Sequence, residues 1–158
     1  MSSEIRLPHL TPAGDAHMVD VSAKEVTNRS ASAEAIVVLE KHTAEALFGG
    51  TLPKGDALAA IRLAGIMASK RTAELIPLCH PLPIDSVEVS VGRVDEGARI
   101  VAHVTTTGRT GVEMEAMTAV SIAALTLYDM VKGIERGVEV RSVRLLRKAG
   151  GRSGTWER

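Results

Sequence analysis

The sequence predicts one α+β domain in which an antiparallel sheet carries helices on one face. A chain of 158 residues fits a single domain and can bury a core without disulfides. Its elements are expected in the order strand, helices, strand, strand, helix, strand, which is the β-α-β-β-α-β pattern of ferredoxin-like folds. We assign this domain to residues 31–150, an extended arm to residues 1–30, and a glycine-rich basic tail to residues 151–158.

The first half of the domain contains one expected strand and two expected helices. Residues 33–40 include a β-branched run and predict a strand. Residues 42–48 predict a short helix that two glycines end. Residues 56–72 predict a longer helix, with Asp56 as its N-cap and apolar residues at three-residue spacing. The prolines of residues 76–83 exclude a helix there and predict a rigid loop.

The second half predicts a hairpin, a helix and a last strand. Valines alternate with other residues over residues 86–94, and residues 99–106 form the expected second strand of the hairpin. Residues 115–132 predict a long helix, and residues 138–148 predict a strand that bends near Arg141, where the alternation slips.

Composition excludes several classes of protein. One Phe, one Trp and one Tyr, with zero net charge, argue against a nucleic acid partner, because such binders use aromatic stacking and positive charge. The single cysteine, Cys79, excludes an internal disulfide. We find no signal peptide, and the apolar run at residues 116–128 is too short to cross a bilayer. We therefore expect a cytoplasmic protein without a membrane partner.

The same apolar run predicts an oligomer. Residues 116–128 carry no charged side chain on any face of the expected helix. A helix of a small two-layer domain usually shows a polar stripe to solvent. We therefore expect a second subunit to cover part of this helix.

Three groups of residues are candidates for chemistry. His80, held between prolines, suits proton transfer or phosphate binding, although an ordinary loop histidine is the alternative. Glu113 and Glu115 follow a glycine-rich turn and fit either helix capping or recognition of a guanine-like edge, with equal support. Asp129 and Lys132, three residues apart, fit a surface ion pair or an acid/base pair.

The two ends of the long helix are too far apart to share one small ligand. Glu115 and Asp129 are separated by about 21 Å at the rise of an α-helix. If both ends are functional, the site must combine residues from two subunits.

Cations near glycines form a further group, including Lys54, Lys148 and Arg152. Such groups suit a polyphosphate, whereas each cation alone is more often solvated surface. The spacing matches neither a P-loop nor a dinucleotide fingerprint, and no histidine pair has metal-ligand spacing.

Taken together, several segments closely resemble the cyclic pyranopterin monophosphate synthase family of molybdenum cofactor biosynthesis. They are HMVDVSAK at residues 17–24, KGD at 54–56, AGIMASKRTAELIPLCHPL at 64–82, TGRTGVEMEAMTAVSIAALTLYDMVK at 107–132 and VRLLRKAGGRSG at 143–154. The combination of LIPLCHPL and TGVEMEAMTA is highly specific. Arg152 departs from the family pattern, where a lysine is expected.

The resemblance implies a homohexamer, a trimer of dimers with active sites at the dimer interface. It implies a phosphorus–oxygen lyase that converts (8S)-3′,8-cyclo-7,8-dihydroguanosine 5′-triphosphate to cyclic pyranopterin monophosphate and releases diphosphate. The implied catalytic residues are Asp129, Lys132 and His80, and we expect neighbouring cations to lower the pKa of Lys132. The implied substrate-binding residues are Leu78, Cys79, His80, Glu113, Met114, Glu115, Lys54, Lys148 and Arg29.

No cofactor or metal site is expected, and Mg²⁺ is considered only as an ion that accompanies the triphosphate. The alternative function is a non-catalytic oligomer that binds GTP or a pterin. Such a protein would use the same cations and glutamates but would not need Asp129 or Lys132.

Overall fold

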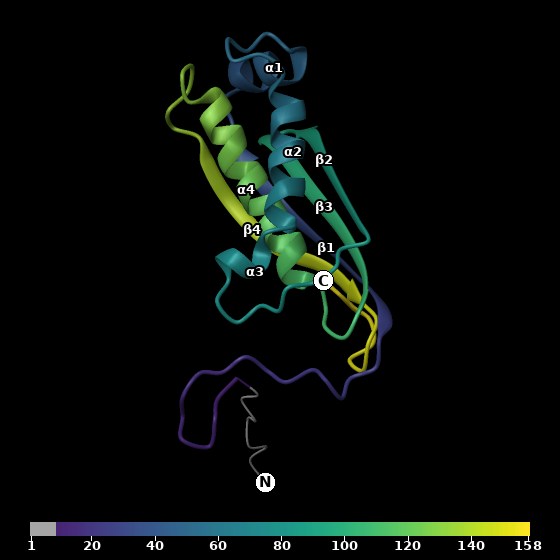
Figure 1. Cartoon of the computed structure of the whole chain (residues 1–158). Helices are drawn as coiled ribbons and strands as arrows, with labels where there is room; N and C mark the ends of the chain where they lie inside the picture. Colours follow the sequence, from purple (N-terminus) through teal and green to yellow (C-terminus); the bar gives the residue numbers. More distant parts are fainter. Residues whose placement is uncertain (1–8) are drawn as a thin grey trace.

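The computed structural model describes residues 9–158 and shows a two-layer α+β domain (Figure 1). The elements follow the chain in a simple order. They are β1 (Thr27–Val38), α1 (Lys41–Gly49), α2 (Ala57–Ser69), α3 (Thr72–Leu75), β2 (Ser86–Val94), β3 (Gly97–Gly108), α4 (Glu113–Val131), β4 (Glu139–Ala149) and β5 (Trp156–Glu157).

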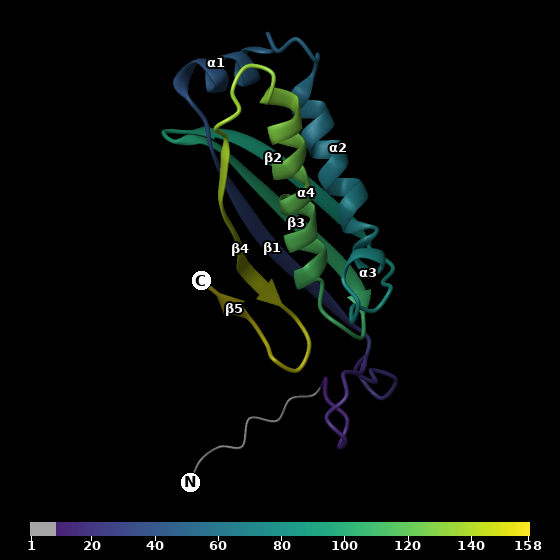
Figure 2. The ribbon, with the colours of Figure 1, turned by 90° about the vertical axis from the view of Figure 1, so that its left-hand side faces the viewer.

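The sheet order is β2-β3-β1-β4-β5, and every neighbouring pair is antiparallel. The two long helices, α2 and α4, lie side by side on one face of this sheet, while α1 lies at one end and α3 at the other (Figures 1 and 2). The first four strands have the order of a ferredoxin-like fold, so the predicted fold class is confirmed.

Small side chains let α4 approach the sheet closely. The strand residues beneath it include Ala33, Ala35 and Ala102, and its own buried face is rich in alanine. The neighbouring helix α2 approaches α4 at Gly65, where an added Cβ would lie 3.1 Å from the Ala119 carbonyl oxygen and 3.2 Å from Val89. The aliphatic, alanine-rich composition therefore produces thin, closely packed layers.

One helix, α4, is long and apolar enough to cross a membrane by length and composition. It is longer than the uncharged run in the sequence because it begins at Glu113 and ends at Val131. Half of its most apolar window is buried, and it packs across β1, β3 and β4. It is the central helix of this core.

Several predicted boundaries differ from the structure. The first strand begins at Thr27, so the predicted arm of residues 1–30 overlaps β1, and residues 1–8 of that arm lie outside the described part. The predicted helix at residues 56–72 ends at Ser69, and a separate turn, α3, follows. The pairing of β4 with β1 is irregular next to Arg141, where the bend was expected.

The glycine-rich basic tail ends in a short strand that adds to the sheet. Trp156 and Glu157 form β5, which pairs with Lys148 and Arg147 of β4. Arg158 lies over the Trp156 ring and donates a hydrogen bond to the Leu145 carbonyl. The loop from β4 to β5 is thereby held beside Lys148.

Candidate active site

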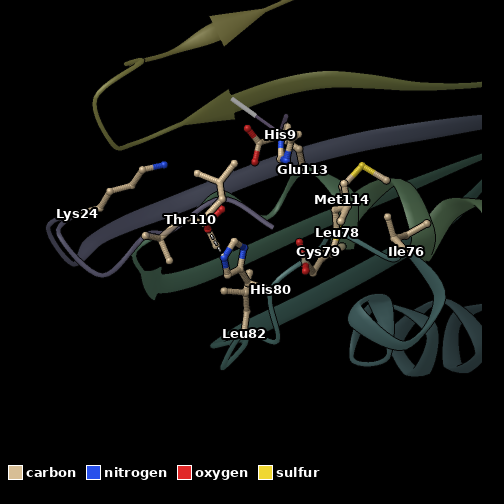
Figure 3. Close-up of a pocket in the computed structure, with 14 residues that line it drawn as sticks. His9, Lys24, Ile76, Leu78, Cys79, His80, Leu82, Thr110, Glu113 and Met114 are labelled. Carbon is tan, nitrogen blue, oxygen red and sulfur yellow. Dashed lines mark hydrogen bonds between the residues drawn. The ribbon is translucent and has the colours of Figure 1, made fainter. Parts of the chain in front are cut away.

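A cavity of about 480 Å³ lies where α4 begins, and we call it the His80 pocket (Figure 3). Its walls come from the loop after α3, the turn between β3 and α4, the first turn of α4 and the N-terminal arm. The structure brings six predicted binding residues together in this pocket. They are Leu78, Cys79, His80, Glu113, Met114 and Glu115.

His80 is oriented by the arm. Its Nε2 lies 2.8 Å from the Val19 carbonyl oxygen, which can only accept a hydrogen bond. Nε2 therefore carries a proton, and the neutral ring has its basic nitrogen at Nδ1. The arm thus selects the tautomer in which His80 can take up a proton at Nδ1.

Glu113 forms an ion pair with Lys148 at 3.2 Å, although the two residues come from α4 and β4. Lys148 also donates a hydrogen bond to Ser153 in the loop that leads to β5. Gly111 makes room for this arrangement, because a Cβ there would collide with the Glu113 carboxylate. Lys148 is therefore held at the pocket by groups from two other segments.

Burial controls the protonation of two groups in the pocket. Glu115 is only 4% exposed, and burial raises the pKa of its carboxyl to about 7, with the negative charge of Glu113 adding to the effect. Burial also raises the pKa of the Cys79 thiol, and the charge of Glu115 acts in the same direction. Cys79 therefore stays a thiol at neutral pH rather than a thiolate nucleophile.

The raised pKa of Glu115 predicts a pH-dependent change in stability. Between the ordinary pKa of 4.5 and about 7, the folded chain binds the Glu115 proton more tightly than the unfolded chain, so stability falls as pH rises through this window. We expect Glu115→Gln to raise the free energy of unfolding by about 2 kcal/mol near pH 8 and by little near pH 5. Denaturant unfolding at the two pH values measures this difference. An equal effect at both would contradict a buried, titrating carboxyl.

Arg29 lies beside the His80 pocket and lines an adjoining hollow together with Lys24 and Arg152. Its Nε donates a hydrogen bond to the Gly108 carbonyl oxygen at 2.9 Å, which fixes the guanidinium against the end of β3. A Cβ at Gly151 would collide with this guanidinium. Lys24 borders both the pocket and the hollow, so a single extended anion can reach both.

A second group lies at the other end of α4, and we call it the Asp129 cluster. Asp129 forms ion pairs with Lys132 at 2.7 Å and with Lys54 at 3.0 Å. Lys54 comes from the loop before α2, so the cluster joins two segments. Asp129, Lys132 and Lys54 are all substantially exposed.

The cluster corrects the expected pKa of Lys132. Hydrogen bonds from Lys132 and then Lys54 lower the pKa of the Asp129 carboxyl. The same interaction with Asp129 raises the pKa of Lys132 rather than lowering it. Asp129 therefore keeps Lys132 as an ammonium group, which can donate a proton or bind an anion.

The pocket and the cluster do not meet within the chain. They lie at opposite ends of α4, which has 19 residues and spans about 28 Å (Figure 1). The structure therefore separates Asp129, Lys132 and Lys54 from the other predicted site residues.

The arm residues of the pocket were not predicted from the sequence. His9, Val19 and Lys24 line it, and Val19 acts through its backbone carbonyl. The HMVDVSAK segment indicated that the arm is more than a linker. A contact made by a backbone carbonyl, however, cannot be predicted from a pattern of side chains. Within residues 9–158, no three His, Cys, Asp or Glu side chains form a group that could hold a metal ion.

Comparison with known proteins identifies the family. Residues 18–151 match the model of the MoaC family. The chain belongs to the MoaC family. It is 53% identical over 153 residues to a Streptomyces avermitilis protein, covering 97% of this chain and 90% of that one. It is 54% identical to a Thermomicrobium roseum protein, with 96% and 93% covered, and 49% identical to a Novosphingobium aromaticivorans protein, with 96% of each covered. All three relatives are named cyclic pyranopterin monophosphate synthase.

In this MoaC-family chain the matched segment contains every predicted site residue, from Arg29 to Lys148. It also contains Val19 and Lys24 of the arm, whereas His9 lies outside it. The part of the arm that orients His80 therefore belongs to the family segment.

Proposed function

We propose that this chain is a cyclic pyranopterin monophosphate synthase of molybdenum cofactor biosynthesis. It converts (8S)-3′,8-cyclo-7,8-dihydroguanosine 5′-triphosphate to cyclic pyranopterin monophosphate and releases diphosphate. The observation that carries the proposal is the family match, in which the two most specific segments form facing walls of one pocket. The relatives that bear this enzyme name are similar along nearly the whole chain.

The pocket supplies groups for both halves of the reaction. Opening the dihydropurine ring and building a pterin requires proton transfers. The His80 ring, which the Val19 carbonyl orients, and the Glu115 carboxyl, whose pKa is raised to about 7, are the groups that we assign to them. Closing the cyclic phosphate while diphosphate leaves requires positive charge around the triphosphate. We assign this charge to Arg29 and Lys148 at the pocket and to Lys54 at the Asp129 cluster.

We further propose that each active site joins the His80 pocket of one chain to the Asp129 cluster of another. We assign residues of both groups to the reaction, and one chain keeps them at opposite ends of α4. Large apolar side chains on α2 and α4, including Leu63, Met67 and Leu125, are each more than half exposed, which supports coverage by a second copy. A homohexamer built as a trimer of dimers satisfies this requirement.

The enzyme is proposed to work in the cytoplasm without a resident cofactor. Its substrate is a nucleotide-derived triphosphate, and Mg²⁺ enters, where it is used, as the counter-ion of that triphosphate. We assign the phosphate contacts to arginine and lysine side chains, because Arg29 and Arg152 line the hollow and Lys148 lies against Glu113 of the pocket.

Incubation with the cyclic nucleotide triphosphate tests the function. We expect one diphosphate and one cyclic pyranopterin monophosphate per substrate consumed, measured by a coupled diphosphate assay and by mass spectrometry of the pterin. GTP under the same conditions is the matched control and should release no diphosphate. Binding of the cyclic nucleotide without diphosphate release would instead favour the alternative of a non-catalytic binding protein.

A further inference from the structure

A second, smaller cavity of about 140 Å³ lies beside the His80 pocket. The end of α2, the α3 turn and the loop that follows them form its walls, and we call it the rear cavity. Three residues, His80, Leu82 and Glu115, line both the pocket and the rear cavity, and Glu115 is the only carboxylic acid among them. Glu115 therefore connects the space for substrate with a separate space behind it.

Ser69 is an unpartnered polar group in the wall of the rear cavity. It is 1% exposed, and its Oγ has no hydrogen-bond partner among the described residues. The Thr72 hydroxyl donates a hydrogen bond to the Ser69 backbone carbonyl oxygen at 2.9 Å, and this contact does not involve the Ser69 hydroxyl. An orphaned buried hydroxyl is unfavourable, and a polar cavity of this size holds several water molecules that can satisfy it.

The other walls of the rear cavity include charged residues that reach the protein surface. Lys70, Arg71 and Glu74 line it from the α2 end and from α3, and Arg71 pairs with Glu74 at 2.9 Å. These three side chains are exposed, so the cavity has a polar route to solvent.

On the side of the pocket, the titratable neighbours of Glu115 are Glu113, Cys79 and His80. Burial and Glu113 favour the proton-bearing form of Glu115, so its carboxyl begins as an acid near neutral pH.

We propose that Glu115 passes a proton between the substrate and the rear cavity, and that the Ser69 hydroxyl positions the water through which this proton is replaced. The inference rests on the proposed function, because it needs a substrate in the His80 pocket. Glu115 is then the catalytic acid, and Ser69 is a positioning residue that acts through it.

The proton balance has two steps. The Glu115 carboxyl gives its proton to an atom of the substrate and becomes a carboxylate. A proton from bulk solvent enters along the polar route, and the rear-cavity water that is hydrogen-bonded to Ser69 accepts this proton as it gives one of its own to the carboxylate, so that the water is left unchanged. No oxidant, metal or further reactant takes part.

A double-mutant cycle tests whether Ser69 acts through Glu115. We expect Ser69→Ala to lower kcat about fivefold with little change in KM, as for the loss of one hydrogen bond in a relay. In the Glu115→Gln background, the same Ser69→Ala change should have no further effect on the residual kcat. Ser69→Thr keeps the hydroxyl and should restore most of the activity. An equal fold-loss in both backgrounds, or no loss in the wild type, would overturn the proposal.

A substrate-free measurement separates this inference from the proposed function. Infrared difference spectroscopy can detect the carboxylic acid band of Glu115, which is assigned as the band that the spectrum of Glu115→Gln lacks. The intensity of this band is then followed as a function of pH. Because hydrogen bonds to a carboxylate favour its charged form, Ser69→Ala should move the titration midpoint upward by about half a pH unit. An unchanged midpoint contradicts the Ser69 connection even if the enzyme is active. Absence of diphosphate release by the wild type refutes the function, while this titration still decides whether Ser69 and Glu115 are linked.

Discussion

Lys132→Ala is expected to lower kcat at least about 10³-fold while the fold persists, because it removes a charged group from proton transfer or charge stabilisation. Lys132 is about half exposed and contacts Asp129 through its ammonium group, so truncation removes no core packing. The measurement is diphosphate release under saturating substrate, with circular dichroism and thermal unfolding to verify the fold.

Lys41→Ala is the matched control for this change. Lys41 is also a helix-associated lysine in an ion pair, with Glu45 at 4.0 Å. It lies on α1 at the same end of the molecule as the Asp129 cluster (Figure 1), but its side chain is 86% exposed and its ion-pair partner is not a site residue. Its activity should equal that of the wild type. Activity of Lys132→Ala within tenfold of the wild type would refute the assigned role of Lys132.

Mixing two inactive variants is expected to restore activity if the site is shared between chains. His80→Ala damages the pocket and Lys132→Ala damages the cluster, so a mixed dimer contains one site with both halves intact and one site with neither. With random assembly, half of the dimers are mixed and each has one working site of two, which gives about a quarter of the wild-type activity. Co-expression with two different affinity tags, followed by sequential purification, isolates the mixed assemblies for assay.

The control for mixing is a double variant that carries both changes, co-expressed with the wild type. It has the same numbers of mutated residues, but every mixed dimer then contains two half-damaged sites. Only the wild-type dimers in these assemblies keep working sites, which gives about a quarter of the wild-type activity, whereas sites contained within one chain would give about half. If the two single variants instead fail to recover activity, the pocket and the cluster do not meet across a subunit contact.

The sequence predicted the layers of the fold better than the ends of its elements. Alternating valines and the apolar stripe of α2 are local signals, and the order of elements then determines the sheet topology. The break after Ser69 and the start of β1 at Thr27 depend on tertiary contacts, because Thr27 pairs with Gly108 far along the chain. Pairing partners at such separation leave little trace in local composition.

For the site, residue types and resemblance predicted which residues gather, but not what each one contacts. Asp129 and Lys132 are three residues apart on one helix, so their ion pair was predictable. The contacts of Asp129 with Lys54 and of Glu113 with Lys148 join distant segments, which the local sequence does not reveal. The expected shift of the Lys132 pKa was wrong because the hydrogen bond and the charge of Asp129 raise this pKa. The hydrogen bond from His80 to Val19 uses a backbone carbonyl, which every residue possesses and no motif marks.

The ordered tail determines what intrinsic fluorescence can report about this protein. Trp156 is the only tryptophan, and it sits in β5 against Arg158 rather than in the core. Its neighbour across the sheet is Lys148, whose ammonium group pairs with Glu113 at the pocket. Tryptophan emission is therefore a local optical probe of the β4–β5 hairpin and of ligands that displace Lys148. Unfolding of the alanine-rich core must be followed by another signal, such as far-ultraviolet circular dichroism.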